Sequence, residues 1–490
     1  MKLKELLSAA GLSVPSGAPG VTISQVTDDS RSVRPGALFV AVLGARADGH
    51  RFIAKAVEQG AAAVIAERDV PVPAPAVKIR VLSTRAALGP LAHAFWGEPS
   101  KRLKVLGVTG TKGKTTVAWA AQHLLEAAGL RCGLIGTVCH RLADGEYPSD
   151  NTTPGALFLQ ENLERMAGAK FKACAMEVSS HALDQRRTDG ILWACGAFTN
   201  LAPEHLDYHE TLERYLEAKL RLFRSLPRDS HAVINREDPS FEKVRGATRA
   251  QVVTYGLNAG ADFTVREVRG TLEGTRFTLE TPEGSFPAVT PLIGLHNLEN
   301  LLAAVGAAAA AGVPSALAAE GLASFGGVPG RLERIECGQP FPVFVDYAHT
   351  DGALRRVLEQ LKGLGSRKIL TVFGCGGNRD KTKRPRMGQA AAELSDRVII
   401  TSDNPRGEDP PAIAREILAG ARKGKASTEV ILDRREAIRA ALESADEGWL
   451  VMIAGKGHEA AQIFADRSVP FDDRAVVREL LGSVTLTGSP

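Results

Sequence analysis

A glycine-rich segment at residues 107–116 carries the clearest chemical signal of this sequence. It reads GVTGTKGKTT and stands between an apolar run and a helical pattern. Glycines let backbone N–H groups turn towards phosphate oxygens, and the start of the following helix adds partial positive charge. Lys114 can then reach the β- and γ-phosphates, and the Thr115 hydroxyl can bind Mg²⁺. Valine occupies position 108, where the strict phosphate-loop pattern has glycine, but the strand–turn–helix context predicts a nucleotide site rather than a plain glycine turn.

Side chains able to bind a metal follow two later apolar runs. Glu177 ends the run KACAMEV, and His205 follows the run that ends at Asn200. A carboxylate and a histidine at neighbouring strand ends can bind the Mg²⁺ that accompanies a nucleotide, a hard cation that favours oxygen ligands. Either residue alone would equally suit a surface loop, but their place downstream of a phosphate loop favours function. Lys219 lies in a helical pattern, where a solvated lysine is the ordinary interpretation.

Polar residues also follow apolar runs in the last third of the chain. Asp346 ends one run and can hydrogen-bond a ribose or base, while Arg331, in the connection before it, can reach a γ-phosphate. Two more runs end in residues 401–406 and 455–459. Arginine grips a carboxylate bidentately and glutamate pairs with an ammonium, so these two segments suit an amino-acid substrate. From the residues alone, ordinary turns remain an alternative.

Strand-like runs alternate with helical patterns almost throughout, which predicts an α/β fold with mostly parallel sheets. Period-two alternation over 253–286 predicts an antiparallel layer, small residues over 297–311 predict a closely packed helix, and 97–102 resembles a linker. Buried strands are expected at 37–44, 61–67, 103–110, 172–178, 194–200, 231–235, 342–348, 368–374, 396–401 and 449–455.

Length and composition bound the class of protein. The 490 residues are 44% apolar and 24% charged, as in a soluble globular protein of about three domains. Sixty basic against fifty-six acidic residues gives no reason to expect nucleic acid or an anionic membrane as partner. The six cysteines are scattered without metal or disulfide spacing, and no apolar stretch suits a signal peptide or a membrane span. We therefore expect reduced thiols, a cytoplasmic location and a monomer.

In combination, these motifs resemble those of the Mur ligase family of peptidoglycan synthesis, three-domain ATP-dependent amide ligases. The resemblance runs from about residue 20 to residue 475, nearly the whole chain. Besides GTKGKTT, the matching segments are DSR (29–31), DGH (48–50), NTTP (151–154), EVSSHAL (177–183), HLDYH (205–209), GLHNLEN (294–300), PGRLERI (329–335), DYAHT (346–350), DNPR (403–406) and GKGHE (455–459).

The resemblance implies a fold and a role for each matching position. It implies a UDP-binding domain at 1–98, a central phosphate-loop domain with a mostly parallel sheet at 99–330 and a Rossmann-like, amino-acid-binding domain at 331–490. Catalysis would rest on Lys114, Glu177, His205 and Lys219. ATP would be bound by Gly110, Thr111, Lys112, Gly113, Lys114, Thr115, Thr116, Asn297, Asn300, Arg331 and Asp346. The UDP-muramoyl dipeptide would be bound by Ser30, Thr152, Thr153, Ser179, Gln185 and Arg187, and the amino acid by Arg379, Asn404, Pro405, Arg406, Gly455 and Glu459.

Lys219 falls where the family carries a carbamylated lysine, which replaces the solvated-lysine interpretation. Carbamylation turns a cation into a carboxylate-like anion, so the implied Mg²⁺ ligands are Thr115, Glu177, His205 and carbamylated Lys219. Three positions depart from the family pattern: Glu204 and Asn378 stand where aspartate is usual, and the pair at 350–351 lacks a proline.

The implied reaction joins meso-diaminopimelate to the D-glutamate γ-carboxylate of UDP-N-acetylmuramoyl-L-alanyl-D-glutamate through an acyl phosphate, with ATP and Mg²⁺. Arginine at 406 is typical of family members that take diaminopimelate, although L-lysine and L-ornithine stay open. A folylpolyglutamate synthase would share the loop and the ligase chemistry, but it should lack the DSR, DNPR and GKGHE motifs. A phosphate-loop kinase or NTPase is an alternative of another class.

Overall fold

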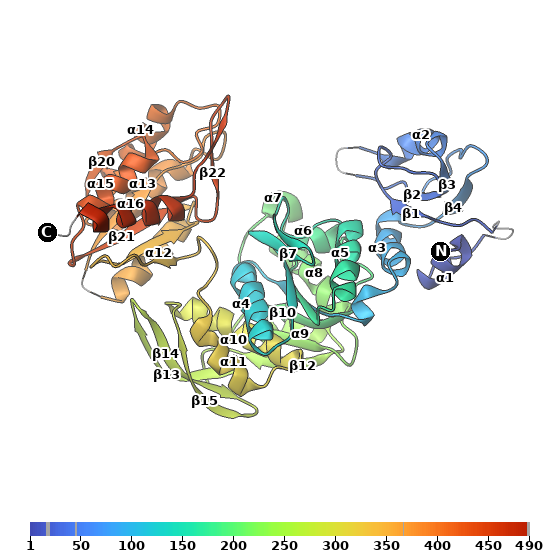
Figure 1. The fold of residues 1–490 in the computed structure, drawn as a ribbon, viewed down its shortest axis with the longest axis horizontal. Helices are drawn as coiled ribbons and strands as arrows, with labels where there is room; N and C mark the ends of the chain where they lie inside the picture. Colours follow the sequence, from blue (N-terminus) through green and yellow to red (C-terminus); the bar gives the residue numbers. More distant parts are fainter. Residues whose placement is uncertain (16–19, 45–46, 366, 488–490) are drawn as a thin grey trace. The chain divides into compact units, whose positions relative to one another are not determined.

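The computed structural model describes residues 1–15, 20–44, 47–365 and 367–487 (Figure 1). These residues form two compact units, and each carries parallel sheets covered by helices, so the predicted α/β class is confirmed. Within the described residues, no helix is both long and apolar enough to span a membrane. The six cysteines of this part of the chain are free thiols, and five of them are buried. The first unit comprises Met1–Glu267, Phe277–Val289 and Leu295–Phe325, and the second comprises Val268–Arg276, Thr290–Gly294 and Gly326–Pro490.

A four-stranded parallel sheet opens the first unit, in the order β1-β2-β3-β4. The strand expected at 37–44 ends at Val40, because the Val42 carbonyl accepts a hydrogen bond from Gly49 N (2.9 Å) and the chain turns away. The elements are α1 (Leu3–Ala9), β1 (Gln25–Thr27), β2 (Ala37–Val40), η1 (Gly49–Phe52), α2 (Ile53–Glu58), β3 (Ala61–Ala66), β4 (Val77–Arg80) and α3 (Thr84–Phe95).

The segment expected to be a linker is ordered. It contains η2 (Pro99–Lys101), in which Pro99 and Ser100 are buried. Proline suits the first position of a helical turn, and Ser100 Oγ accepts a hydrogen bond from Leu192 N (2.9 Å). This connection is therefore packed against the central sheet.

The central sheet has eight strands in the order β12-β11-β10-β5-β9-β6-β7-β8. The strands from β12 to β6 pair in parallel, and β7 and β8 add an antiparallel hairpin. Parallel strands buried on both faces read as apolar runs, which is why the sequence shows them clearly. The strands are β5 (Lys104–Thr109), β6 (Cys132–Ile135), β7 (Cys139–Leu142), β8 (Gly145–Pro148), β9 (Ala173–Glu177), β10 (Trp193–Phe198), β11 (His231–Asn235) and β12 (Gln251–Tyr255).

Helices connect these strands and cover the sheet. The small residues of α10 allow close packing against α4, as expected for 297–311. The helices are α4 (Lys114–Ala127), α5 (Ala156–Gly168), α6 (Ser180–Asp184), α7 (Leu206–His209), α8 (Leu212–Arg224), α9 (Phe241–Ala247), α10 (Leu295–Ala310), α11 (Ser315–Gly321) and η3 (Leu322–Ser324).

The period-two stretch forms a separate sheet in the order β13-β14-β15, with β13 at Thr264–Thr271, β14 at Gly274–Thr281 and β15 at Gly284–Thr290. Its expected beginning at residue 253 is wrong. Residues 251–255 form β12 and pair in parallel with β11 instead.

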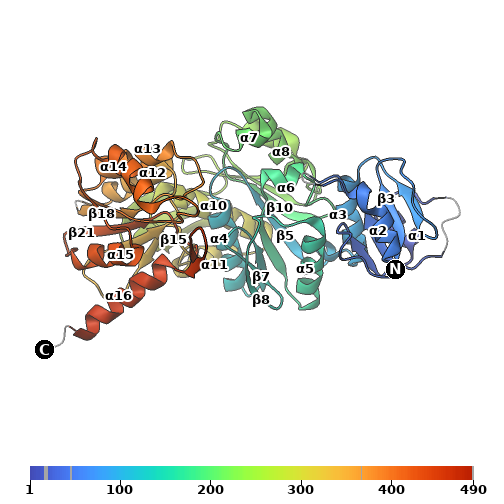
Figure 2. The same cartoon turned by 90° about the horizontal axis from the view of Figure 1, so that it is seen from above.

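The second unit contains a six-stranded sheet in the order β16-β17-β21-β18-β19-β20, parallel except for β16. Figure 2 shows its strands between α12, α13 and α14 on one side and α15 and α16 on the other, each side with its own apolar core. The strands are β16 (Glu333–Ile335), β17 (Val343–Asp346), β18 (Lys368–Phe373), β19 (Arg397–Ile400), β20 (Ser427–Val430) and β21 (Trp449–Ala454), with a small pair β22 (Ala461–Ile463) and β23 (Ser468–Pro470). The helices are α12 (Asp351–Gly363), α13 (Lys383–Leu394), α14 (Pro410–Ala421), α15 (Arg434–Glu443) and α16 (Asp473–Thr487).

Candidate functional site

The phosphate loop lies where the sequence predicts it, between β5 and α4. Gly110 (φ +144°) and Gly113 (φ +87°) adopt backbone conformations that L side chains rarely take. A Cβ at Gly110 would overlap Thr199 Oγ1, and one at Gly113 would overlap Asn300 Oδ1. Asn300 of α10 thus lies against the loop, as expected for a residue of the same nucleotide site.

The end of β10 holds this loop from one side. The Asn200 carbonyl accepts a hydrogen bond from Thr111 N (2.8 Å), and Asn200 Oδ1 accepts one from Lys112 N (3.0 Å). Lys112 Nζ forms an ion pair with Glu204 Oε1 (2.8 Å). Glutamate at 204 therefore still supplies a carboxylate to the loop.

Two lysines converge on the loop carbonyls. Lys114 Nζ donates to the carbonyl oxygens of Gly110 (3.0 Å) and Thr111 (2.9 Å), and Lys219 Nζ donates to that of Gly110 (2.7 Å). Lys219 is only 1% exposed, so it is not a solvated helix lysine. Burial, followed by the nearby charge of Lys114, lowers the pKa of Lys219 well below its ordinary value, against a smaller opposing effect of Glu204.

A buried carboxylate stands beside the start of α4. Thr115 Oγ1 donates to Glu177 Oε2 (2.8 Å), Thr137 N donates to Glu177 Oε1 (2.7 Å), and Thr137 Oγ1 donates to Glu177 Oε2 (3.1 Å). These oxygens are of the kind that Mg²⁺ prefers. No group of three or more His, Cys, Asp or Glu residues in the described ranges could hold a metal ion. The side chains therefore fit a cation whose remaining ligands come from phosphate oxygens, water or a carbamate.

His205 joins a cluster of rings near Lys219. Its backbone is left-handed (φ +57°), and its ring centroid lies 4.8 Å from that of His181 and 6.2 Å from that of Tyr215. The ring of Tyr215 also contacts Lys219 Nζ, 4.2 Å from its centroid. This proximity brings His205 and Lys219 into one neighbourhood, and metal binding by His205 stays a prediction.

Five of the six residues expected to bind the dipeptide substrate gather around the end of β9. Thr153 Oγ1 donates to the Glu177 carbonyl (2.8 Å) and accepts from Ser179 N (3.0 Å). Arg187 donates to the Thr153 carbonyl (2.8 Å) and to Gln185 Oε1 (2.8 Å).

Thr137 links this group to the buried carboxylate. Its hydroxyl lies 3.0 Å from Thr152 Oγ1 as well as 3.1 Å from Glu177 Oε2. Thr137 was not among the residues predicted from the sequence, although it lies just past the end of β6, after Gly136, and such strand-end positions pointed to the other residues. The sixth expected residue, Ser30, lies after β1 in the first sheet, and none of the described hydrogen bonds joins it to the other five.

In the second unit, the two expected amino-acid segments meet through a buried lysine. Asn404 Nδ2 donates to Glu459 Oε2 (2.7 Å). Lys456 Nζ donates to Asn404 Oδ1 (3.1 Å), Glu459 Oε2 (3.1 Å) and the Ala461 carbonyl (2.6 Å), and its side chain is fully buried. Lys456 is a second residue that sequence analysis did not single out, although it lies inside the GKGHE motif.

The expected arginines lie at a glycine turn next to this pair. Arg406 Nη1 donates to the Gly377 carbonyl (3.1 Å), and a Cβ at Gly376 would come within 2.9 Å of Arg406 Nη1 and 3.9 Å of Arg379 Cγ. Asn378 Oδ1 accepts from Gly407 N (3.1 Å), which keeps the acceptor that an aspartate would supply. Pro405 and Gly455 are buried parts of the two segments.

Arg331 and Asp346 also belong to the second unit. Asp346 accepts hydrogen bonds from Leu332 N and Ala348 N, each 2.7 Å, and burial raises its pKa against the charge of Arg331. The Arg331 guanidinium lies over the ring of Tyr347, 4.7 Å from its centroid. Their contact with a nucleotide, and that of Asn297 on α10, stays a prediction.

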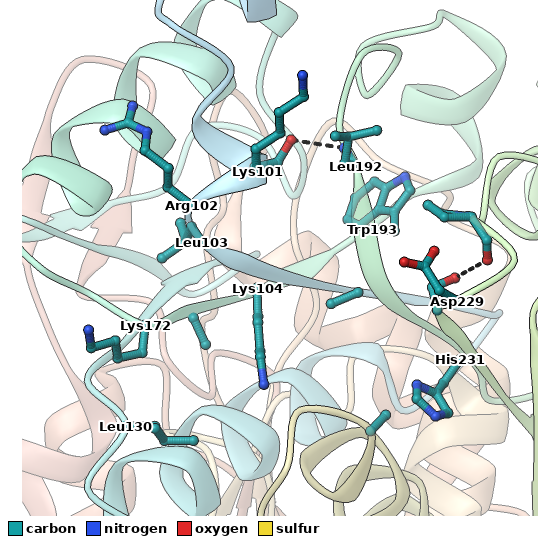
Figure 3. Close-up of a pocket in the computed structure, with 16 residues that line it drawn as sticks. Lys101, Arg102, Leu103, Lys104, Leu130, Lys172, Leu192, Trp193, Asp229 and His231 are labelled. Atoms are coloured by element: carbon teal, nitrogen blue, oxygen red, sulfur yellow. Dashed lines mark hydrogen bonds between the residues drawn. The ribbon is translucent and has the colours of Figure 1, made fainter.

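A cavity of about 850 Å³ lies at the amino ends of the central parallel strands, whereas the phosphate loop lies at their carboxyl ends (Figure 3). Its walls include the first residues of four parallel strands, among them Lys104, Trp193 and His231. Lys104 Nζ donates to the Ala311 carbonyl (2.7 Å), and Arg102 pairs with Glu164. Open α/β sheets bind ligands at the carboxyl ends of their strands, so we do not assign the chemistry to this cavity.

Comparisons with known proteins find relatives that match nearly the whole chain. Residues 22–96 match the family model described as "Mur ligase family, catalytic domain", residues 108–308 match "Mur ligase middle domain", and residues 330–457 match "Mur ligase, glutamate ligase domain". A protein of Geobacillus thermodenitrificans named UDP-N-acetylmuramoyl-L-alanyl-D-glutamate--2,6-diaminopimelate ligase is 44% identical over 486 residues, which cover 98% of this chain and 99% of that protein. A protein of Solibacter usitatus with the same name is 44% identical over 98% of both chains. A solved structure with that name is 34% identical, covers 99% of this chain and 100% of its own, and superposes with a TM-score of 0.77.

Proposed function

We propose a function for this chain from one premise: it belongs to the Mur ligase family. The chain is an ATP-dependent amide ligase that joins meso-2,6-diaminopimelate to the D-glutamate γ-carboxylate of UDP-N-acetylmuramoyl-L-alanyl-D-glutamate, in peptidoglycan precursor synthesis. One observation carries this proposal: Thr115, Glu177, Thr137 and Thr152 form one chain of hydrogen bonds between the phosphate loop and the dipeptide-binding group.

The first step transfers the γ-phosphoryl group of ATP to the γ-carboxylate, which gives an acyl phosphate and ADP. The backbone N–H groups at the start of α4 favour the negative charge of the phosphates, whereas those of Thr111 and Lys112 donate to Asn200 and shape the loop. Lys114, which contacts the loop carbonyls in this structure, can turn its ammonium group to the β- and γ-phosphates. Thr153, Ser179 and Arg187 would hold the dipeptide so that its carboxylate faces the loop.

Thr115 and Glu177 are the residues that would hold Mg²⁺, with His205 and a carbamate on Lys219 as further ligands. Mg²⁺, when bound, neutralises the charge that develops on the phosphate oxygens. The buried position and lowered pKa of Lys219 support carbamylation, because only a neutral amine combines with CO₂.

The second step is attack of the diaminopimelate amine on the acyl phosphate, with loss of phosphate. We assign the amino acid to the segments around Asn404 and Glu459, where a carboxylate can bind its ammonium group. Arg379 and Arg406 supply cations for its carboxylates. Water would hydrolyse the acyl phosphate, so the site has to exclude it before chemistry.

We place the enzyme in the cytoplasm as a monomer that acts on small molecules and needs neither nucleic acid nor a membrane. Its substrates are nucleotides and free amino acids, and its near-balanced charge offers no general attraction to polyanions.

The test measures ADP release and amide formation together. Release should require both the UDP-muramoyl dipeptide and a diamino acid, whereas release from ATP alone would favour a phosphate-loop NTPase. Meso-diaminopimelate, L-lysine and L-ornithine are then compared in parallel. We expect the highest kcat/KM for meso-diaminopimelate, and a preference for lysine or ornithine would refute the role given to Arg406.

A further inference from the structure

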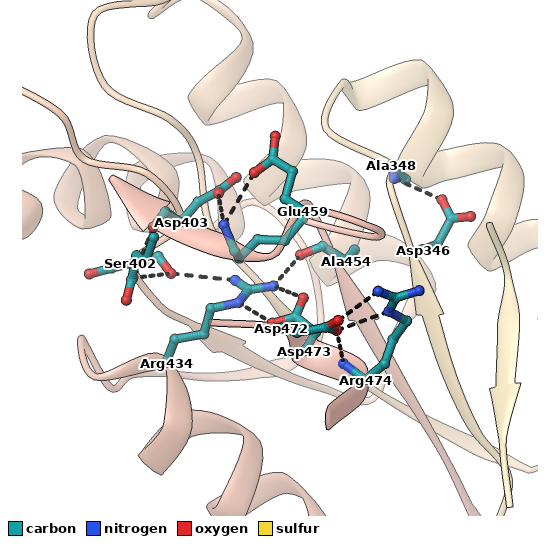
Figure 4. A network of polar contacts seen from close by, with 12 residues as sticks. Asp346, Ala348, Ser402, Asp403, Arg434, Ala454, Glu459, Asp472, Asp473 and Arg474 are labelled. Carbon is teal, nitrogen blue, oxygen red and sulfur yellow. Dashed lines mark hydrogen bonds and ion pairs between the residues drawn. The ribbon is translucent and has the colours of Figure 1, made fainter. Parts of the chain in front are cut away.

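A fully buried ion pair lies beneath the two segments assigned to the amino acid. Arg434 Nε donates to Asp473 Oδ1 (2.7 Å) and Arg434 Nη2 donates to Asp473 Oδ2 (2.7 Å), and both side chains are 0% exposed (Figure 4). The remaining bonds of the guanidinium go to backbone carbonyls. Nη2 donates to the Ala454 carbonyl (3.0 Å), and Nη1 donates to the Ser402 carbonyl (3.4 Å).

These two carbonyls belong to the residues directly before the two motifs. Ser402 directly precedes the DNPR segment after β19, and Ala454 is the last residue of β21, directly before GKGHE. In sheet order, β18 separates β19 from β21. One guanidinium therefore ties together two strand ends that are not neighbours in the sheet.

The pair is anchored by the starts of two helices. Arg434 is the first residue of α15, whose N-cap Asp433 accepts a hydrogen bond from Glu436 N (3.0 Å). Asp473 is the first residue of α16. A carboxylate at a helix start is favoured by the helix dipole, so Asp473 is well placed to fix the guanidinium.

A contribution to stability does not by itself explain such a pair. Moving two charges out of water costs free energy that their attraction only partly recovers, and apolar side chains of similar volume are often equally stable. Burial tends to lower the pKa of Arg434, but the charge and hydrogen bonds of Asp473, together with the charges of Asp403 and Glu459, raise the pKa overall, so the group stays charged. The charged, planar guanidinium group of arginine differs from an apolar side chain because it binds several hydrogen-bond acceptors at defined angles.

We propose that Arg434, fixed by Asp473, is a positioning residue for the amino-acid site: it sets the separation of the DNPR and GKGHE segments and hence of Asn404 and Glu459. Both side chains are fully buried, so in this assignment they act through the two segments and not by contact with the substrate. The inference rests on the proposed function in that it takes these two segments as the amino-acid site.

The decisive variant replaces both charges, Arg434→Met with Asp473→Leu, so that neither half of the ion pair stays buried without the other. We expect this variant to fold, since similar exchanges are often neutral. Its KM for meso-diaminopimelate should rise about 10- to 100-fold, because small displacements of positioning groups cost that much. Its KM for ATP and for the UDP-muramoyl dipeptide should not change. Hydrogen exchange should become faster in residues 402–406 and 455–459 and stay unchanged in α4.

A matched control removes a more exposed ion pair of the same sheet, Arg397→Met with Glu429→Leu, whose side chains are 30% and 40% exposed. It should leave every KM unchanged. If the double variant at 434 and 473 is insoluble, Arg434→Lys is used instead, because it keeps the positive charge but lacks the planar guanidinium group. The same rise in KM for meso-diaminopimelate and the same faster hydrogen exchange in the two segments are expected.

A folded variant at position 434 with unchanged KM for the diamino acid and unchanged exchange in both segments would overturn the proposal. Failure of the proposed function itself is distinct. In that case the wild-type enzyme shows no ADP release that depends on a diamino acid, while the exchange experiment still reports whether Arg434 holds the two segments.

Discussion

Lys219 donates to the Gly110 carbonyl from a position with 1% exposure, where a protonated ammonium is costly. A carbamate at this position would be an anion that can pair with the nearby ammonium group of Lys114 or with Mg²⁺. We predict that Lys219→Ala lowers kcat by about 10³-fold, a loss of the size seen when a group that stabilises charge in the transition state is removed. Steady-state ADP release checks this, with the exposed Lys243→Ala as the matched control.

The carbamate itself is measurable. Wild-type protein should carry the additional mass of one CO₂, lost in Lys219→Ala, and excess bicarbonate should not rescue that variant. Near wild-type turnover in Lys219→Ala would contradict the role of this residue.

Thr137 contacts both the buried carboxylate and the dipeptide-binding group, so its hydroxyl links the two. We predict that Thr137→Val lowers kcat/KM for the UDP-muramoyl dipeptide about 10- to 100-fold, as is usual for groups that orient metal ligands. Thr137→Ser should recover most of the loss. Binding of the dipeptide without ATP, measured by calorimetry, gives a second readout.

The control for this prediction is Thr109→Val. Thr109 is fully buried in β5, and its hydroxyl has no hydrogen-bond partner in the described part of the chain. Loss of that hydroxyl should leave kcat/KM unchanged. Equal effects of the two valine variants would show that the contacts of Thr137 do not matter.

At the scale of elements, the turn from β5 into α4 depends on close backbone approach. Gly113 (φ +87°) and Gly129 (φ +78°) share a left-handed backbone, but only Gly113 has a neighbour, Asn300, where a Cβ would lie. Gly113→Ala should therefore weaken ATP binding strongly, whereas Gly129→Ala, with open space around it, should cost only about 1 kcal/mol of stability. Calorimetric titration with ATP and urea unfolding of both variants distinguish the two effects. Equal ATP affinities would contradict the steric argument.

A second element, the loop after DNPR, is held by charge. Arg384 of α13, followed by Asn378 N and Lys381, keeps the pKa of Glu408 at about 2, below its ordinary 4.5. The folded state thus favours ionised Glu408, so its contribution is complete above about pH 4.5 and is lost as pH falls towards 2. Glu408→Gln should lower the urea midpoint of unfolding at pH 6, and its difference from wild type should shrink at pH 3. The exposed Glu447→Gln should show no difference at either pH.

The elements that sequence analysis predicted well are those defined by local pattern. Buried parallel strands are continuous apolar runs, and the phosphate loop has all its parts within ten residues, so β5, β9 and β18 lie close to their expected bounds. Thr137 and Lys456 were missed because their importance arises from contacts across the sheet. Thr137 matters only because β6 pairs with β9, which carries Glu177. Lys456 likewise matters through its bonds to Asn404, which lies far from it in sequence, and to Ala461.

At the scale of the whole molecule, the boundary expected between residues 330 and 331 lies near the start of the main part of the second unit, at Gly326. That unit also takes in Val268–Arg276 and Thr290–Gly294, far upstream in sequence. Ile293 belongs to its apolar core, and Gln360 Nε2 donates to the Ile293 carbonyl (3.0 Å). The alternating pattern of β13–β15 gave no sign of this, because it marks strand faces without indicating which core they join. Whether residues 1–98 fold as a separate domain stays a prediction.

Leu272 tests this division. It is 7% exposed and packs in the same core as Leu354, Leu358 and Leu361 of α12, although it lies directly after β13, outside the expected third domain. Leu272→Ala should cost about 2–5 kcal/mol, the range for a buried leucine. The loss should appear as faster hydrogen exchange in α12, with α4 protected as before. Leu317→Ala, at a residue that is 43% exposed, should change neither helix. If Leu272→Ala instead loosens α4 and leaves α12 protected, the upstream segment stabilises the central unit, and the second unit would then begin at the boundary that the sequence predicts.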